Sequence, residues 1–254
     1  MGILDSFKLN GKVAIVTGGG RGLGTGLALA MAEAGADVAV VGRTGLDEMK
    51  NKIEALGRRC AVVKADLSQQ DAVPAIIDAT VKELGRVDIL INNAGIIRRA
   101  AITDFTQQDW DDVIQVNQRA VFFLSQAAAR VMVKQNQGGR IINIASMLSF
   151  QGGIRVASYT AAKSAVMGIT RIFANELSQH RITCNAIAPG YMATDNTAPL
   201  RADEKRNAEI IARIPAGRWG TPDDLKGAAV FLASPASDYL TGHTLAVDGG
   251  WLSR

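Results

Sequence analysis

Short apolar runs and helical stretches alternate strictly along the first 91 residues of the chain. The apolar runs are rich in β-branched residues and predict strands at 12–17, 37–41, 60–65 and 88–91. Helices are expected between them, up to about residue 34, over 46–56 and over 72–84. Strands that alternate with helices form βαβ units, in which successive strands lie parallel and the crossovers cover the sheet. This order restricts the chain to an α/β fold with a doubly wound parallel sheet and helices on both faces.

The rest of the chain continues the alternation with one interruption. Strands are expected at 141–146, 181–187 and 243–247, and helices over 108–135, from about 157, and over 222–234. Residues 193–213 interrupt the pattern, because they are polar and flanked by prolines. We expect this region to leave the sheet and to form a mobile lid at about 191–214. Neither a repeat nor a linker divides the sequence, so 1–254 is expected to be a single domain.

A glycine-rich turn follows the first expected strand and reads T-G-G-G-R-G-L-G at 17–24. Glycines between a strand and a helix let the backbone approach a pyrophosphate closely, and the helix N-terminus favours its negative charge. The dinucleotide fingerprint G-x-G-x-x-G is not present in any register. The turn instead has the form T-G-x-x-x-G-x-G, and a glycine turn without a ligand stays open as the alternative.

The end of the second expected strand bears on which cofactor would bind. A dinucleotide fold places the group that contacts the adenosine ribose there. Gly42 offers no carboxylate for a free 2′-hydroxyl, whereas Arg43, together with Arg21 in the first turn, could clamp a 2′-phosphate. We therefore predict that NADP is preferred, with NAD as the alternative. Either arginine could equally be a solvated surface cation.

Polar residues follow the third and fourth expected strands as well. Asp66 could hydrogen-bond an adenine amino group or cap the next helix. Asn92-Asn93-Ala94-Gly95 forms a small turn against which a cofactor ribose could lie. Within the long helix, Asn117 has apolar neighbours, where an asparagine competes with its own backbone unless it has a specific partner. An internal hydrogen bond is the plainer explanation of Asn117.

The candidate chemistry lies between 146 and 163. Tyr159 and Lys163 are four residues apart on an expected helix, so their side chains share one face. A nearby cation favours phenolate and lowers the tyrosine pKa, which suits proton exchange with an alcohol or a carbonyl oxygen. Ser146, at the tip of the preceding strand, could donate a hydrogen bond to the same oxygen. A Tyr-x-x-x-Lys pair alone is common on surface helices, so the assignment needs the other motifs.

Composition and charge exclude several classes of protein. The chain has 28 basic and 24 acidic residues, a net charge of +4 and 5% aromatic residues, without the basic runs of a nucleic-acid surface. A mild basic excess suits anionic small molecules. Two separated cysteines, Cys60 and Cys184, predict buried thiols in a reducing compartment, and His180 and His243 lack the spacing of a metal site. We expect a cytoplasmic enzyme with no metal, no nucleic-acid partner and no membrane segment.

Taken together, the motifs resemble the short-chain dehydrogenase/reductase family. The matches are T-G-G-G-R-G-L-G at 17–24, N-N-A-G at 92–95, Asn117, Ser146, Y-T-A-A-K at 159–163, P-G at 189–190 and V-D-G-G at 247–250. The resemblance implies a Rossmann-like, seven-stranded parallel sheet, a nicotinamide cofactor and an NAD(P)-dependent oxidoreductase. It also implies a catalytic tetrad of Asn117, Ser146, Tyr159 and Lys163. Family members are usually homotetramers and frequently dimers, so a homotetramer or a dimer is expected.

The same resemblance implies roles for individual residues. Lys163 would hold the nicotinamide ribose as well as lower the tyrosine pKa, and Asn117 would anchor a water that relays protons. The expected cofactor contacts are Gly18, Gly20, Arg21, Gly22, Leu23, Gly24, Arg43, Asp66, Leu67, Asn93, Ala94, Gly95, Tyr159, Lys163, Pro189, Gly190, Met192 and Thr194.

A closer likeness points to one branch of the family. I-I-R-R at 96–99, N-I-A-S-M-L-S-F-Q-G-G-I-R-V at 143–156, A-P-G-Y-M-A-T at 188–194 and P-A-G-R-W-G at 215–220 are similar to dehydrogenases of six-carbon sugar acids. Their substrates are 2-deoxy-D-gluconate, 2-dehydro-3-deoxy-D-gluconate and gluconate. The expected substrate contacts are Arg98, Ser146, Met147, Gln151, Arg155, Tyr159 and Tyr191.

A sugar acid brings a carboxylate into the site, and a cation is needed to pair with it. Arg98, Arg99 and Arg155 lie on segments expected to converge on Tyr159, and Arg155 is the first choice because its loop follows Ser146. Two other functions stay open. A 3-oxoacyl carrier-protein reductase would share the tetrad but would need an apolar acyl channel. A regulator that senses NADP(H) would need no tetrad at all.

Overall fold

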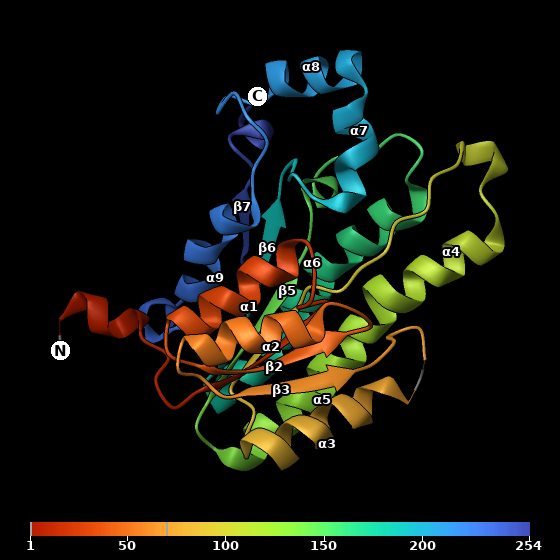
Figure 1. Cartoon of the computed structure of the whole chain (residues 1–254). Coiled ribbons are helices and arrows are strands. Elements are labelled where there is room, and N and C mark those ends of the chain that lie inside the picture. Colours follow the sequence, from red (N-terminus) through yellow and green to blue (C-terminus); the bar gives the residue numbers. More distant parts are fainter. Residues whose placement is uncertain (1, 70) are drawn as a thin grey trace.

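The computed structural model describes residues 2–69 and 71–254, and its strands form one parallel sheet in the order β3-β2-β1-β4-β5-β6-β7 (Figure 1). This sheet confirms the predicted seven-stranded, doubly wound fold. The chain passes outward from β1 to β3 and then returns to place β4 beside β1. The strands are β1 (Val13–Thr17), β2 (Asp37–Gly42), β3 (Cys60–Lys64), β4 (Ile89–Asn92), β5 (Gly139–Ile144), β6 (Ile182–Pro189) and β7 (Thr244–Val247).

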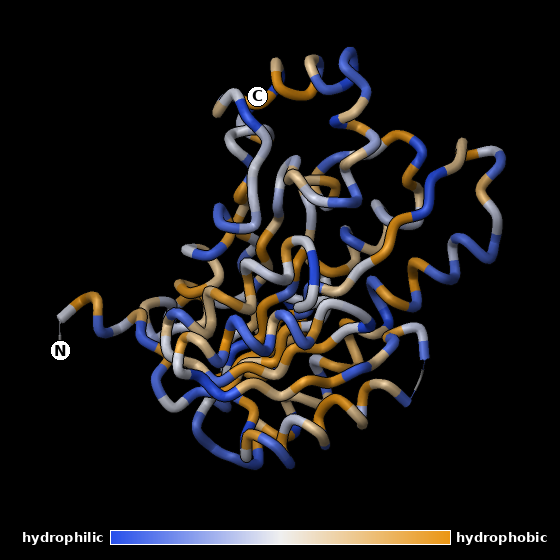
Figure 2. The backbone as a smooth tube through the Cα atoms, viewed as in Figure 1, coloured by the Kyte–Doolittle hydropathy of each residue, from blue (hydrophilic) through white to orange (hydrophobic). Residues whose placement is uncertain are grey.

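Helices cover both faces of the sheet because alternate strand residues point to opposite sides. On one face, α1 (Leu23–Glu33), α2 (Leu46–Ala55) and α9 (Lys226–Ala233) pack on a core that includes Ala14 and Val16 of β1. On the other, α3 (Ala72–Leu84), α5 (Ala120–Gln135) and α6 (Ala157–Leu177) pack on Val13 and Ile15. Figure 2 shows that hydrophobic residues are concentrated in these central strands. The site residues at the strand ends therefore rest on a core that is packed from both sides.

The helix predicted over 108–135 is interrupted. It consists of α4 (Gln107–Ile114) and α5, joined by a π-helical turn over Gln115–Arg119. A π-turn inserts one extra residue into a helix and is frequent at functional sites. The inserted turn carries Asn117, whose side chain is fully buried. Hydrophobic spacing alone did not reveal the insertion, because the apolar face continues across it.

The region expected to leave the sheet contains a short turn over Asp195–Thr197 and the helices α7 (Ala198–Ala202) and α8 (Glu204–Arg213). In Figure 1, α7 and α8 project away from the sheet at the top of the view. The strand before this region is longer than predicted. β6 continues to Pro189, because its last residues pair with β7. The strand expected at 181–187 thus ends two residues later than predicted.

The sequence predicted neither a membrane segment nor a metal site, and the structure bears on both predictions for the described residues. Among the helices of 2–69 and 71–254, none is long and apolar enough to cross a bilayer. No group of three histidine, cysteine, aspartate or glutamate side chains in these ranges lies close enough together to hold a metal ion. Cys60 and Cys184 are both buried and unpaired with each other, and burial raises the pKa of the Cys60 thiol to about 12.

Candidate active site

The carboxyl ends of β1 and β4 are tied together where the strand order reverses. The Thr17 hydroxyl accepts hydrogen bonds from the backbone N–H groups of Asn93 and Ala94, both at 3.0 Å. The Asn93 side-chain amide donates to the Thr17 carbonyl at 2.8 Å. Ligands of open parallel sheets bind in the crevice at such a reversal. The N-N-A-G turn and the glycine turn therefore form one rigid floor.

The glycine turn between β1 and α1 leaves its backbone open to a ligand. Gly18 and Gly22 have φ values of +64° and +55°, which glycine adopts without the penalty of a side chain. A Cβ placed on Gly22 would meet no atom nearer than 3.9 Å, so only the cavity lies beyond it. This backbone leads into the N-terminus of an 11-residue helix, which favours a phosphate. The turn therefore fits the pyrophosphate of a dinucleotide.

Gly24 has a different role from the one expected. A Cβ on Gly24 would lie 2.0 Å from the Gly18 carbonyl oxygen, so α1 packs against the turn at this position. Gly24 does not line the cavity beside the turn. Its small size lets the helix start close to the ligand-facing backbone, which is a packing role.

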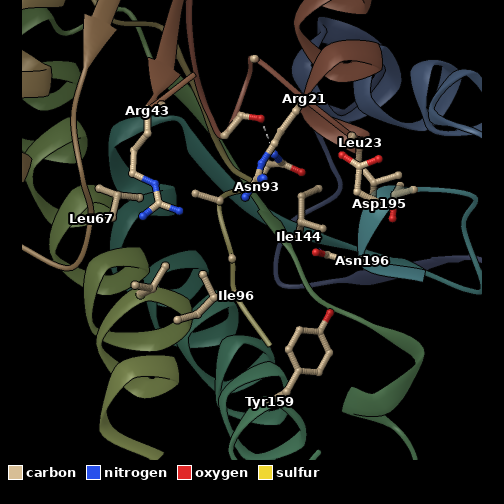
Figure 3. Close-up of a pocket in the computed structure, with 18 of the residues that line it drawn as sticks. Arg21, Leu23, Arg43, Leu67, Asn93, Ile96, Ile144, Tyr159, Asp195 and Asn196 are labelled. Atoms are coloured by element: carbon tan, nitrogen blue, oxygen red, sulfur yellow. Dashed lines mark hydrogen bonds between the residues drawn. The ribbon is translucent and has the colours of Figure 1, made fainter. Parts of the chain in front are cut away.

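A cavity of about 590 Å³ extends from the glycine turn to the start of α6 (Figure 3). Arg21 and Arg43 lie at one end of it in Figure 3, and the phenol of Tyr159 points into it from the other. Most of the residues predicted from sequence line this cavity: Gly18, Gly20, Arg21, Gly22, Leu23, Arg43, Asp66, Leu67, Asn93, Ala94, Gly95, Arg98, Ser146, Tyr159, Lys163, Pro189, Gly190, Met192 and Thr194.

Arg43 and Asp66 form an ion pair at the end of the cavity near β2 and β3. The Arg43 Nη1 lies 3.5 Å from the Asp66 carboxylate, and both side chains remain partly exposed. Asp66 also accepts a hydrogen bond from the Ser68 backbone N–H at 3.0 Å. That bond, with the Arg43 charge, holds the pKa of Asp66 below its ordinary value. Any anion that binds Arg43 here competes with the Asp66 carboxylate.

The Tyr159, Lys163 and Ser146 side chains meet where β5 ends against α6. The Lys163 Nζ donates to the Ile144 carbonyl at 2.5 Å and lies 5.7 Å from the centre of the Tyr159 ring. Ser146 is buried and follows β5 by two residues. Its hydroxyl accepts a hydrogen bond from the Leu148 backbone N–H at 3.1 Å. The same hydroxyl lies near enough to Tyr159 to lower its pKa, and both side chains line the cavity.

The electrostatics of this cluster differ from the expectation for Tyr159. Burial raises the pKa of Tyr159, and the Ser146 hydrogen bond and the Arg99 charge lower it by less. Burial also lowers the pKa of Lys163 to about 8. The expected depression of the tyrosine pKa by Lys163 is therefore not a feature of this structure. The lysine ammonium donates its hydrogen bond to the Ile144 carbonyl, and burial away from water has the largest effect on the pKa of the phenol.

Asn117 joins the π-turn to the loop after β4 and not to the cavity itself. Its side-chain oxygen accepts from the Ile96 N–H at 2.8 Å, and its amide donates to the Ile96 carbonyl at 2.9 Å. A Cβ on Gly95 would come within 3.3 Å of the Asn117 oxygen. The internal hydrogen bond considered from sequence is thus present, and it fixes the loop that carries Arg98 and Arg99.

Four of the expected substrate contacts lie outside the cavity wall. Met147 is buried in a cluster with Trp251, and Tyr191 packs edge-on against Trp219 and Trp251. Gln151 accepts from Arg213 of α8 at 3.5 Å. Arg155, the first choice for the carboxylate, is exposed and has a φ of +63°. None of these residues lines the cavity: Met147, Gln151, Arg155 and Tyr191.

Comparison with known proteins agrees with this geometry. A family model described as enoyl-(acyl carrier protein) reductase matches residues 18–252. A 2-dehydro-3-deoxy-D-gluconate 5-dehydrogenase of Escherichia coli (strain K12) is 59% identical over 252 residues, which cover 99% of this chain and 100% of that protein. The chain belongs to the short-chain dehydrogenase/reductase family. The family predicted from the motifs is confirmed.

Two further members of the family resemble the chain over nearly its whole length. A gluconate 5-dehydrogenase of Gluconobacter oxydans (strain 621H) is 44% identical, over 97% of this chain and 96% of that protein. The crystal structure of a gluconate 5-dehydrogenase from Burkholderia cenocepacia J2315, in complex with NADP and tartrate, is 39% identical. It superimposes with a TM-score of 0.94 and covers 100% of both chains.

In this short-chain dehydrogenase/reductase, Arg99 lies nearer to Tyr159 than the sequence indicated. Arg98 is neutralised by Asp109 at 3.3 Å and Asp112 at 3.0 Å on α4. Arg99 instead hydrogen-bonds the Asn196 carbonyl at 3.1 Å and acts electrostatically on Tyr159. It therefore bridges from the loop after β4 to the segment after β6. The acidic residues Asp109, Asp111 and Asp112 were the available signal that one arginine of the pair would be neutralised.

Proposed function

We propose that the chain is an NAD(P)-dependent dehydrogenase that interconverts a secondary hydroxyl of a six-carbon sugar acid and the corresponding ketone. The proposal rests mainly on one observation: the chain is 59% identical, over nearly its whole length, to a 2-dehydro-3-deoxy-D-gluconate 5-dehydrogenase. The names of the three relatives agree on reaction at carbon 5 of the sugar acid. Carbon 5 of 2-dehydro-3-deoxy-D-gluconate is accordingly the first candidate.

Tyr159 is the proton-transfer group in this proposal. Its phenol points into the cavity, and the Ser146 hydroxyl lies near enough to lower its pKa. During oxidation, the phenolate takes the hydroxyl proton of the substrate, and during reduction the phenol returns a proton to the carbonyl oxygen. A bound nicotinamide dinucleotide supplies hydride acceptance and donation at the substrate carbon. Ser146 holds the reacting oxygen by a preorganised hydrogen bond.

Lys163 and Asn117 support this chemistry from behind Tyr159. Lys163, with a pKa of about 8, keeps most of its positive charge at neutral pH and faces the phenol ring. In this proposal its hydrogen bond to the Ile144 carbonyl fixes α6, and with it the phenol, against the end of β5. Asn117 holds the Gly95–Ile96 backbone beside the cavity, which in this proposal shapes the floor under the nicotinamide ribose.

NADP is the preferred cofactor in this proposal. A relative of known structure was crystallised with NADP. Here Arg43 and Arg21 lie on the cavity wall where the adenosine ribose would rest, and an arginine fork suits a phosphate. The ion pair of Arg43 with Asp66 competes with that phosphate, so NAD remains the less favoured alternative. The residues present fit a 2′-phosphate without any change of backbone.

The substrate carboxylate is proposed to pair with Arg99. Of the three arginines considered, Arg98 is already neutralised, while Arg99 and Arg155 are both exposed and neither lines the cavity. Arg99 contacts only the Asn196 carbonyl among the described residues and lies close enough to Tyr159 to influence its charge. Its remaining guanidinium donors can bind a carboxylate bidentately.

Three broader features belong to the same proposal. Residues 191–214 form a lid that covers the substrate, supported by the position of Thr194, Asp195, Asn196 and Thr197 on the cavity wall. The enzyme is a homotetramer or a dimer, supported by the exposed Phe123 on α5 and Ile172 on α6. It acts in the cytoplasm, in keeping with two buried free thiols. Light scattering of the purified enzyme tests the oligomeric state.

The second candidate is a carrier-protein reductase, which the description of the matching family model favours. A panel of sugar acids and acetoacetyl thioesters, assayed with NADP(H) and NAD(H) at the nicotinamide absorbance, separates the two. Turnover of a hexonate or its 5-keto form at 10-fold or greater kcat/KM over the thioester supports the proposal. The reverse preference would make the chain a reductase of acyl thioesters.

A further inference from the structure

Ser149 connects the turn that carries Ser146 to the helix that carries Lys163. Its hydroxyl donates a hydrogen bond to the Lys163 carbonyl at 2.6 Å and accepts one from the Ser146 backbone N–H at 3.3 Å. Its own backbone N–H donates to the Ser146 carbonyl at 2.9 Å. One small side chain thus contacts the backbone of both residues.

Lys163 is bound to this turn on both sides of Ser146. Before Ser146, the Lys163 Nζ donates to the Ile144 carbonyl at the end of β5. After Ser146, the Ser149 hydroxyl reaches the Lys163 carbonyl. One contact on each side of Ser146 restrains both the position and the rotation of the backbone between the two contacts. The direction of the Ser146 hydroxyl then depends on both contacts.

We propose that Ser149 is a positioning residue for the reaction, and that it aims the Ser146 hydroxyl at Tyr159 by anchoring the Ser146 turn to α6. The inference rests on the proposed dehydrogenase function. Ser149 itself does not line the cavity and touches neither substrate nor cofactor in this scheme. Its effect passes through Ser146, whose hydroxyl is one of the two groups that lower the pKa of Tyr159, the other being Arg99.

A small rotation of Ser146 is enough to weaken that contact. Hydrogen bonds lose strength steeply as their angle departs from linear, and catalytic geometry misplaced by about 1 Å can cost about 100-fold in rate. Without the Ser149 hydroxyl, the turn keeps its backbone hydrogen bond and the Lys163–Ile144 contact, but it loses the second contact with α6 and the acceptor for the Ser146 N–H. We therefore expect a functional loss without unfolding.

Other charged groups near Tyr159 could also shift its pKa. Lys163 lies beneath the ring on α6, and Arg99 approaches from the loop after β4. Arg98 and Asp112 line the same cavity as an ion pair, and Asp195 lines it from the lid. The Ser149→Ala substitution changes none of these charges. A shift in the Tyr159 titration in that variant therefore reports on Ser146.

The experiment compares Ser149→Ala with Ser178→Ala. Ser178 also donates a 2.6 Å hydrogen bond to a carbonyl of α6, that of Ala174, but at the far end of the helix. Steady-state kinetics with the sugar acid that the wild type turns over give kcat and its dependence on pH. A tyrosinate absorbance titration, with Tyr159→Phe to identify the Tyr159 transition, gives the same pKa without any substrate.

Ser149→Ala should lower kcat by about 10- to 100-fold and move the titration of Tyr159 to higher pH in both measurements. Ser149→Thr, which keeps the hydroxyl, should restore the wild-type profile, and Ser178→Ala should match the wild type. An unshifted pH profile, or equal losses in Ser149→Ala and Ser178→Ala, would overturn the inference. Wild-type enzyme inactive on every sugar acid would instead refute the proposed function, and the absorbance titration would still decide the role of Ser149.

Discussion

The Lys163 ammonium lies 5.7 Å from the centre of the Tyr159 ring, while its hydrogen bond goes to the Ile144 carbonyl. Residues four apart on α6 share a face, so the helix sets this separation. The hydrogen bond explains how a lysine with 3% of its surface exposed is tolerated in the core. The arrangement keeps a positive charge behind the phenol at neutral pH and ties α6 to β5.

The first prediction follows from the placement of the phenol. Tyr159→Phe deletes only the hydroxyl, so we expect the fold and dinucleotide binding to remain and turnover to fall by about 10²–10⁴-fold or more. Steady-state kinetics with a hexonate measure the loss, and fluorescence of bound NADPH measures binding. Tyr239→Phe, at an exposed position, is the control. A Tyr159→Phe enzyme within a few-fold of the wild type would exclude Tyr159 as the proton donor.

The second prediction concerns the pH dependence of stability. Because burial lowers the pKa of Lys163 from 10.5 to about 8, the unfolded chain binds more protons than the folded one between these values. Stability contributed at this site therefore rises as the pH increases through that window. Relative to Lys163→Met, the wild type should gain about 2–3 kcal/mol of unfolding free energy between pH 8 and 10.

Urea unfolding of both proteins at pH 7, 8, 9 and 10 checks this prediction. The window ends at pH 10, because ionisation of Tyr159, whose pKa is raised, costs stability above it. Below pH 8 the difference between the two proteins should be constant. A difference that stays flat up to pH 10 would mean that Lys163 titrates like a solvated lysine.

The third prediction concerns cofactor choice. Arg43→Ala removes the fork available to a 2′-phosphate, so the Kd of NADPH should rise by 10-fold or more while that of NADH changes little. Asp66→Asn frees Arg43 from its ion pair and should shift the preference further toward NADPH. Arg206→Ala, an ion-paired arginine on α8, is the control. Equal weakening of both dinucleotides in Arg43→Ala would identify Arg43 as a surface cation.

The fold could be predicted because each strand is apolar on both faces and each helix follows in sequence. The same local signals place the glycine turn, the N-N-A-G turn and the Tyr159–Lys163 pair at strand ends and on one helix face. The π-turn at Asn117 escaped prediction, because an inserted residue leaves the hydrophobic pattern intact. Its detection depends on the Asn117–Ile96 hydrogen bonds, which join segments 21 residues apart.

The substrate end of the site was harder to predict for a different reason. Arg98, Arg99 and Arg155 are equivalent in sequence, and only tertiary contacts distinguish them. Asp109 and Asp112 on α4 neutralise Arg98, and Arg99 lies near enough to Tyr159 to lower its pKa. Long side chains on loops have many rotamers, so their directions depend on neighbours that local patterns do not reveal. The proposed carboxylate partner consequently moves from Arg155 to Arg99.

The last prediction tests that change. Arg99→Met keeps the length of the side chain but removes its charge, so kcat/KM for a sugar acid should fall by about 10–100-fold, because a partly desolvated carboxylate loses its partner. The matching neutral lactone carries no carboxylate, and its kcat/KM should change only a few-fold. Kinetics of both substrates with Arg99→Met and Arg155→Met give four comparisons. Arg155→Met is expected to resemble the wild type on both.

A second readout separates charge recognition from the other contacts of Arg99. Arg99 also holds the Asn196 carbonyl of the segment after β6 and lowers the pKa of Tyr159. Loss of those two contacts would affect acid and lactone alike, and loss of its effect on Tyr159 would move the pH profile of kcat to higher pH for both substrates. Only carboxylate binding produces a loss confined to the acid. Equal losses for acid and lactone would assign Arg99 to the segment after β6 and to Tyr159, and a selective loss in Arg155→Met would return the carboxylate to the loop after Ser146.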